Sequence, residues 1–203
     1  NDAQPIRDVF SKVMSRFADL EKHHPEKLKD VDFLKDQFAF TGELFLGHLR
    51  YGTFGGNSVE NCHPFLRQNN WMTRNLVLAG NFNLTNVDEL FGLLVELGQH
   101  PKEKADTVTA MEKIGHFLDE ENQLLFERFK SQGYNNQQIS GLIAKHLDVQ
   151  RVLSRASREW DGGYAMAGMF GHGDAFVVRD PNGIRPAFFY EDHPLHRWLQ
   201  FLL

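Results

Sequence analysis

The sequence predicts a layered α+β domain, because helical and period-two hydrophobic patterns occupy separate parts of the chain. Apolar residues recur at helical spacing through residues 4–24 and through most of residues 106–160. Residues 160–190 instead alternate apolar and polar positions and contain two turn signals, a pattern typical of antiparallel strands joined by hairpins. Helices and hairpins that are segregated in this way favour an α+β architecture over an alternating α/β one.

Residues 1–43 form a predicted helical lead-in. Pro5 suits the first turn of a helix over residues 4–24, and Pro25 breaks that helix. The charged stretch 26–40 has apolar residues at helical spacing and is expected to form a second helix whose charges face solvent.

A first strand is predicted at Leu44–Tyr51, followed by the glycine-rich loop Gly52–Asn61. The strand would deliver Arg50 to its end, and a guanidinium can grip a carboxylate with two parallel hydrogen bonds. The glycines would let backbone N–H groups approach a ligand closely. Two interpretations stay open here: the lip of a carboxylate-binding pocket, or a strand that ends in a surface arginine and a turn.

The remaining elements follow from local patterns. They are a buried strand at Asn75–Ala79, a helix at Val87–Leu97 opened by a capping box of Asn86 and Glu89, helices from Asp106 to about Trp160 interrupted near Gly133, strands at Tyr164–Phe170, Ala175–Arg179 and Ile184–Tyr190, and turns at Gly171–Asp174 and Asp180–Gly183.

Composition excludes several classes of protein. The 203 residues suffice for one domain with a sizeable core, to which 18 phenylalanines contribute. A net charge of −5 without a basic face argues against nucleic-acid binding, and no apolar run reaches the roughly 18–20 residues of a membrane span. A single cysteine, Cys62, excludes an internal disulfide and fits a reducing cytoplasm. We therefore expect a cytoplasmic protein without nucleic-acid or membrane partners.

Neither the histidines nor the cysteine predicts a metal site. The close pairs His23–His24 and His193–His196 lack carboxylate or cysteine partners at recognised spacing. Cys62 is interpreted as a partly buried, inert thiol rather than a nucleophile.

Four motifs, in order and spacing, resemble a known family over roughly residues 44–190. Gly47–Thr53, Cys62–Phe65 and Asn81–Asn86 resemble the glutaminase domain of the class II, or N-terminal-nucleophile, glutamine amidotransferases. Tyr164–Met166 together with Arg179–Pro186 resembles the amidophosphoribosyltransferase branch of that family, which Tyr51 also favours.

The resemblance implies an N-terminal-nucleophile hydrolase-like α-β-β-α sandwich of two antiparallel sheets. Residues 1–203 would be a single, partial glutamine amidotransferase domain, with a family-like core at 44–190, the lead-in 1–43 and an unmatched tail at 191–203. The domain would be incomplete at its N terminus, because the strand that begins with the nucleophilic cysteine would precede Asn1. The implied activity is hydrolysis of glutamine to glutamate and ammonia, for transfer to a phosphoribosyl acceptor in purine biosynthesis.

The family's site residues carry over by position. The resemblance implies that Arg50, with Tyr51 and Thr53, binds the substrate and that the Arg50 guanidinium holds its α-carboxylate. It implies that Asp106 binds the substrate ammonium. The oxyanion hole would be formed by the Asn81 side chain and the backbone N–H of Phe82.

The departures from the family bear on activity. Phe82 stands where the family has glycine, so its ring could crowd the substrate, and Val108 replaces a glutamate. His63 replaces a glutamine that is common before Pro-Phe. The sequence begins at Asn1 without the family's nucleophilic cysteine, so these 203 residues alone are not expected to hydrolyse glutamine.

Glutamine is thus the expected small-molecule partner, and no cofactor is expected in this domain. Magnesium with phosphoribosyl pyrophosphate would belong only to a transferase domain outside this chain. A sheet edge left uncovered by the absent first strand would favour a homo-oligomer. Two alternatives stay open: a degenerate, non-catalytic amino-acid-binding or assembly domain of the same fold, favoured by Phe82 and Val108, and a glutaminase that serves a different acceptor.

Overall fold

The computed structural model describes residues 5–49, 62–101, 104–188, 190 and 199–202. The chain divides into two compact units, Asn1–Phe45 and Leu46–Leu203. The division lies close to the end of the predicted helical lead-in. The assignment of all 203 residues to one partial domain stays a prediction.

The first unit is helical, which confirms the predicted helices. It comprises α1 (Pro5–His23), the 3-10 helix η1 (Pro25–Lys29) and α2 (Val31–Gln37). The rings of Phe17 and Phe38 pack with centroids 4.5 Å apart, and the Arg16 guanidinium lies over the Phe38 ring and donates to the Gln37 carbonyl. These contacts hold α2 against α1.

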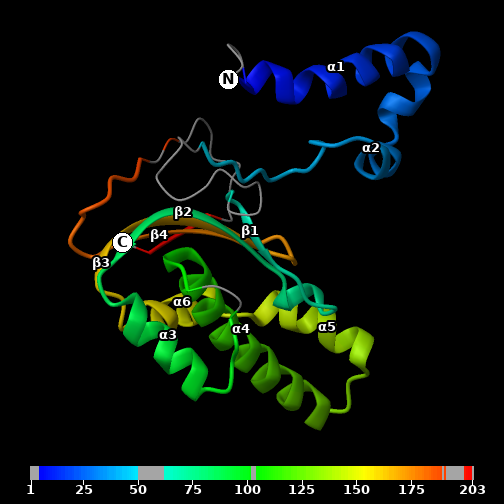
Figure 1. The fold of residues 1–203 in the computed structure, drawn as a ribbon. Helices are drawn as coiled ribbons and strands as arrows, with labels where there is room; N and C mark the ends of the chain where they lie inside the picture. Colours follow the sequence, from blue (N-terminus) through cyan, green and yellow to red (C-terminus); the bar gives the residue numbers. More distant parts are fainter. Residues whose placement is uncertain (1–4, 50–61, 102–103, 189, 191–198, 203) are drawn as a thin grey trace. The chain divides into compact units, whose positions relative to one another are not determined.

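The second unit contains a five-stranded sheet among its described residues (Figure 1). Its strands lie side by side in the order of the chain: β1 (Phe65–Arg67), β2 (Leu76–Leu84), β3 (Gly162–Phe170), β4 (Ala175–Arg179) and β5 (Leu199–Leu202). The first four strands are antiparallel, whereas β5 runs parallel to β4. A short 3-10 helix, η3 (Met72–Arg74), leads into β2.

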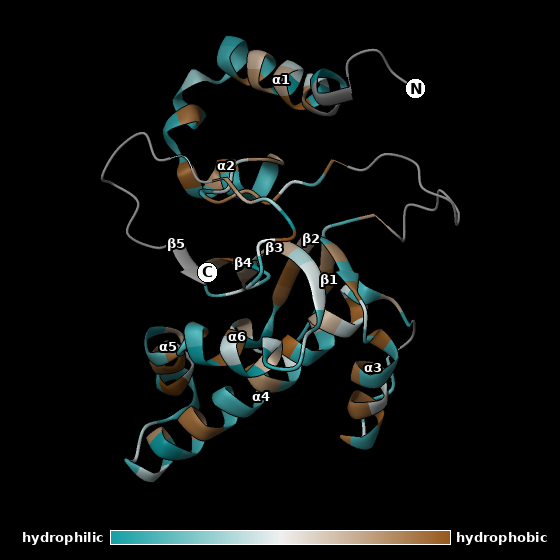
Figure 2. Ribbon diagram, turned by 90° about the vertical axis from the view of Figure 1, so that its left-hand side faces the viewer, coloured by the Kyte–Doolittle hydropathy of each residue, from teal (hydrophilic) through white to brown (hydrophobic). Residues whose placement is uncertain are grey.

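The helices of this unit all lie on one face of the sheet (Figure 1). They are α3 (Val87–Glu96), α4 (Asp106–Ser131), α5 (Asn136–His146) and α6 (Val149–Ser157). Hydropathy changes from residue to residue along these helices (Figure 2), as expected for helices with one side on a core. The α+β class is therefore confirmed, while the two-sheet sandwich stays a prediction.

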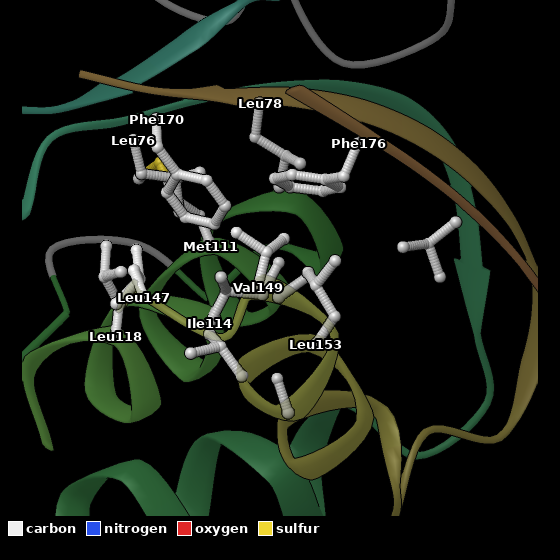
Figure 3. Packing of buried hydrophobic residues seen from close by; sticks show 14 of the residues in the cluster. Leu76, Leu78, Met111, Ile114, Leu118, Leu147, Val149, Leu153, Phe170 and Phe176 are labelled. Carbon is white, nitrogen blue, oxygen red and sulfur yellow. The ribbon is translucent and has the colours of Figure 1, made fainter. Parts of the chain in front are cut away.

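The core lies between the sheet and these helices (Figure 3). Leu76 and Leu78 of β2 are fully buried, as are Ile114 and Leu118 of α4. Phe176 of β4 packs into the same cluster. Full burial of side chains of this size contributes about 1.5–3 kcal/mol each, so this contact between sheet and helices is what fixes β2 and α4 relative to each other.

Two predicted strands are wrong over the residues that the structure describes. Residues 44–49 form no strand, and Leu49 is 84% exposed, so this apolar run has no sheet neighbour to pack against. Residues 184–188 also form no strand. The carboxylate of Asp180 accepts from the N–H groups of Ile184 and Arg185, which removes the donors a ladder would need.

Other expectations need smaller corrections. The predicted strand at Asn75–Ala79 continues to Leu84 as β2, whereas β1 and β5 were not predicted. The predicted capping box is wrong: Asn86 is the N-cap residue of α3, but its side chain makes no capping hydrogen bond. Its side chain instead donates to the Glu159 carbonyl and accepts from the Asp161 N–H, which ties the start of α3 to the start of β3.

Candidate functional site

The candidate site lies where β2 ends and α4 begins. Asn81 and Phe82 belong to β2, and Asp106 is the first residue of α4. The backbone N–H of Leu84 donates to Oδ2 of Asp106 over 3.0 Å. This hydrogen bond places Asp106 beside the end of β2, the strand that bears Asn81 and Phe82.

The side chains of β2 alternate between the two faces of the sheet. The even-numbered residues Leu76, Leu78, Phe82 and Leu84 belong to or pack against the core on the helical side. Asn81 and its neighbour Asn83 are exposed, and their odd positions place them on the opposite face. The ring of Phe82 is therefore directed away from the face that carries the Asn81 amide.

The backbone of β2 presents its N–H groups to alternate edges. The odd-numbered residues pair with β3, as the bond from the Thr85 N–H to the Asp161 carbonyl shows just beyond the strand. The even-numbered N–H groups point to the other edge. There the Gly80 N–H donates to Nδ1 of His63 over 3.1 Å, and the Leu84 N–H donates to Asp106. The N–H of Phe82 consequently points to this same edge, between His63 and Asp106.

His63 is a residue of this site that sequence reasoning treated only as a departure from the family. Besides accepting from Gly80, its ring places Nε2 3.3 Å from the hydroxyl of Thr107. It also stacks on the ring of His48, with centroids 4.5 Å apart and an interplanar angle of 27°. The only advance signal was its place in the Cys-His-Pro-Phe motif, because its partners are 17 and 44 residues away in the sequence.

The bond from Gly80 fixes the proton arrangement of the His63 ring. A backbone N–H can only donate, so Nδ1 of His63 must accept. In the neutral ring the proton is then on Nε2, which donates to the Thr107 hydroxyl. His63 therefore cannot act as a base toward Thr107 in this arrangement, and the pair is not a hydroxyl nucleophile with its base.

The predicted carboxylate clamp lies outside the described residues. This applies to Arg50, Tyr51 and Thr53 alike. His48, two residues before Arg50, is described and stacks on His63. Cys62 is exposed, which corrects the expectation of a partly buried thiol.

A groove of about 710 Å³ runs beside the site between β1, residues 99–101 and α4. Arg67 lies in it and donates to Glu112 over 3.2 Å and to Asp119 over 2.7 Å. Burial by itself would lower the pKa of Arg67, but the hydrogen bonds and charges of these two carboxylates outweigh it and raise that pKa. Val108, which stands in place of the family glutamate, lines the groove, whereas Asn81, Phe82 and Asp106 do not.

The described residues contain neither a metal-binding cluster nor a membrane-spanning helix. In the part of the chain that the structure describes, no three or more His, Cys, Asp or Glu side chains gather in a way that could hold a metal ion. No helix among those residues is long and apolar enough to cross a membrane.

Comparison with known proteins gives a consistent set of relatives, although no protein-family model matches the chain. The amidophosphoribosyltransferase of Pseudomonas aeruginosa is 29% identical over 95% of this chain and 37% of its own length. Those of Pasteurella multocida and Escherichia coli are each 31% identical, over 71% and 78% of this chain and over 25% and 28% of their own lengths. The chain thus spans between 25% and 37% of the length of these relatives.

Solved structures also match part of this chain. One is the glutamine phosphoribosylpyrophosphate amidotransferase of B. subtilis complexed with ADP and GMP, with 26% identity, a TM-score of 0.42, and coverage of 68% of this chain and 23% of that one. Another, described as an allosteric regulatory enzyme of purine biosynthesis, has 28% identity and a TM-score of 0.44, with 68% and 24% covered.

The motifs and the curated relatives agree on the class of protein. The chain is a relative of the N-terminal-nucleophile glutamine amidotransferase domains. Within that class, the proteins that it resembles are amidophosphoribosyltransferases.

Proposed function

We propose that this chain is the glutamine-binding part of a glutamine amidotransferase domain in an amidophosphoribosyltransferase-like protein. The parent protein would hydrolyse glutamine to glutamate and ammonia and pass the ammonia to a phosphoribosyl acceptor. The observation that carries the proposal is the hydrogen bond from Leu84 to Asp106, because it holds a carboxylate beside the strand that bears Asn81 and Phe82. The named relatives support the same reading.

Each described residue has a role suited to its chemistry. Oδ2 of Asp106 accepts from Leu84, and its second oxygen would accept from the substrate ammonium. The exposed Asn81 amide and the Phe82 N–H would stabilise the oxyanion that forms when the side-chain amide of glutamine is attacked. Arg50 would hold the α-carboxylate. The nucleophilic cysteine is proposed to lie outside these 203 residues.

The second candidate is a non-catalytic amino-acid-binding domain of the same fold. It is favoured by Phe82 and Val108, which replace a glycine and a glutamate of the family motif. The Phe82 ring packs on the core side of β2, and its N–H points to the edge of the strand. This arrangement is compatible with amino-acid binding in both candidate functions. The two candidates therefore differ in whether the bound ligand is hydrolysed, not in the ligand itself.

The fold proposed with this function is the two-sheet sandwich. The face of the sheet opposite the helices carries the small or apolar residues Ala79, Ala167 and Val177 at directly paired positions. A row of this kind is suited to packing against a second apolar layer. A homo-oligomer is proposed on similar grounds, since β1 and β5 are the edges of the described sheet.

The proposal is tested by replacing Asp106 with asparagine. Asp106→Asn keeps an oxygen that can accept from Leu84 but removes the charge that would hold the ammonium. We expect glutamine affinity, measured by calorimetry or NMR titration, to fall by about 2–5 kcal/mol, as for a truncated and desolvated charge pair. The matched control is Asp88→Asn in the first turn of α3, where the exposed carboxylate pairs with Lys104.

If the Asp106→Asn variant binds glutamine as tightly as the unsubstituted 203-residue chain does, the proposed ammonium site is contradicted. Release of ammonia from glutamine by the full-length protein separates the two candidates. A protein that binds glutamine without releasing ammonia is the non-catalytic relative.

A further inference from the structure

We propose that His63 is the positioning residue of this site, which holds in register three described segments: His48, β2 at Gly80 and the first turn of α4 at Thr107. The inference rests on the proposed function and deepens it. His63 contacts all three segments: it stacks on His48, accepts from Gly80, which directly precedes Asn81, and bonds to Thr107, which directly follows Asp106.

The contact with β2 fixes the position of the strand relative to His63 at Gly80. The Gly80 N–H donates to Nδ1 of His63, and the next N–H on the same edge is that of Phe82. Gly80 packs so closely against its neighbours that a Cβ there would lie less than 3 Å from Met166, Ala165 and the Phe82 ring. The bond from His63 to this closely packed residue thus bears on where the Phe82 N–H is presented.

The contact with α4 fixes the position of the first turn of this helix relative to His63. Nε2 of His63 donates to the hydroxyl of Thr107, a residue that is only 8% exposed. Asp106 is bonded to Leu84 on the far side of Phe82. The strand and the helix are thus joined at two points, by His63 at Gly80 and by Asp106 at Leu84, and the Phe82 N–H lies between these points.

The contact with His48 adds the third segment. The two imidazole rings stack, and the ring of His63 also meets the edge of Phe65 in β1 with centroids 4.9 Å apart. Stacking needs a flat ring, whereas the bonds to Gly80 and Thr107 need one acceptor and one donor at opposite ends of the side chain. Histidine supplies all three, while glutamine supplies the acceptor and donor alone and phenylalanine the ring alone.

This division of roles defines the experiment, which uses the 203-residue chain with His63→Gln and His63→Phe. Imidazole ¹⁵N shifts of the parent chain are expected to show the proton on Nε2 of His63. His63→Phe removes both hydrogen bonds, so we expect glutamine affinity to fall about tenfold or more, the effect of an unmade bond to a half-buried polar group. His63→Gln, which restores both bonds, is expected to recover part of that loss.

The amide resonances of Phe82 and Leu84 give a readout that a merely stabilising residue would not move selectively. They are expected to shift in His63→Phe and to return toward the parent values in His63→Gln. His24→Phe, at an exposed histidine outside the site, serves as the matched control and is expected to change neither the affinity nor these resonances.

The inference is overturned if the proton is on Nδ1, or if His63→Phe leaves the Phe82 and Leu84 amides in place. It is also overturned if His63→Gln binds glutamine no better than His63→Phe. Failure of the proposed function looks different: the parent chain would then show no saturable glutamine binding, while the tautomer and the amide shifts would still test the role of His63.

Discussion

Phe82 shows how a single residue can depart from a motif without blocking its geometry. The sequence raises the concern that its ring crowds the substrate, because glycine is expected at this position. The pleat of β2 directs the ring into the helical side of the sheet, where it packs against the core. What the site would use is the backbone N–H of Phe82, and every residue except proline provides one.

Asp180 is a second residue whose surroundings determine its chemistry. It is 1% exposed, so burial alone would raise the pKa of its carboxyl. The N–H groups of Arg185 and Ile184 and the charge of Arg179 outweigh this effect and hold the pKa below its usual value of 3.8. The ionised carboxylate thus anchors the turn that ends β4.

We expect Asp180→Asn to lower the free energy of unfolding at neutral pH by about 1.5–3 kcal/mol, the contribution of hydrogen bonds to a charged group. Because the folded pKa is lowered, the stability from this carboxylate is present above the ordinary aspartate pKa. It is lost as the pH falls through the folded value. Urea unfolding between pH 7 and pH 2 should therefore show the difference between parent and variant shrinking below about pH 4. A difference that is constant over that range would contradict the assignment.

At the scale of elements, α4 and β1 are joined by a close fit at Gly115. Arg67 of β1 lies directly over this glycine and reaches Glu112 and Asp119 on either side of it. A Cβ at Gly115 would meet the Arg67 side chain at less than 3 Å, and the two carboxylates oppose its displacement. A glycine inside a long helix is thus explained by packing rather than by backbone flexibility.

Two alanine substitutions, one at an open glycine and one at a crowded glycine, test this explanation by their opposite effects on stability. Gly141 lies in α5 with open space where a Cβ would be, so Gly141→Ala should raise the free energy of unfolding by about 0.5–1 kcal/mol through helix propensity. Gly115→Ala gains the same propensity but overpacks the contact with Arg67, and we expect a net loss of about 1–3 kcal/mol. Thermal unfolding of both variants measures the contrast. Equal stabilisation of the two would show that Arg67 is not held in place.

The sequence predicts an element well when residues near it in the chain determine it, and poorly when a distant segment must pack against it. The long helices follow from hydrophobic spacing, and the β3–β4 hairpin follows from its turn residues. The strands expected at 44–51 and 184–190 fail over their described residues because apolar or period-two patterns do not reveal whether a neighbouring strand is present. The three residues of β1 are too short to give a pattern, and Gly80 and two asparagines conceal the second half of β2.

The site shows the same limit. The motifs identify Asn81, Phe82 and Asp106, and the structure brings them to one end of β2. His63 could not be assigned a role in advance, since its bonds to Gly80 and Thr107 arise only when β1, β2 and α4 pack together. Contacts between residues this far apart in the chain are products of the fold.

At the scale of the whole molecule, the two units differ in the size of their cores. Among the described residues, Leu20 and Phe38 are the buried apolar side chains of Asn1–Phe45, whereas the second unit contains a large cluster around β2 and α4. All three tryptophans, Trp71, Trp160 and Trp198, belong to the second unit. Optical probes can therefore distinguish the two units.

We expect unfolding in urea to occur in two steps, because so small a core supplies little of the free energy that offsets chain entropy. Helical circular dichroism should decrease first, while tryptophan fluorescence stays constant. Both signals should then change together as the second unit unfolds. A single transition that is coincident by both probes would contradict the independence of the two units.

The alternation of β2 also has a consequence for how such a domain can change over time. Its even-numbered side chains fill the core and its odd-numbered ones, including Asn81 and Asn83, lie on the other face. Selection for folding and selection for ligand chemistry therefore act on interleaved but separate positions. Exchange of the exposed outer-face residues Asn81 and Asn83 is therefore expected to disturb the core less than exchange of the even-numbered residues on the inner face.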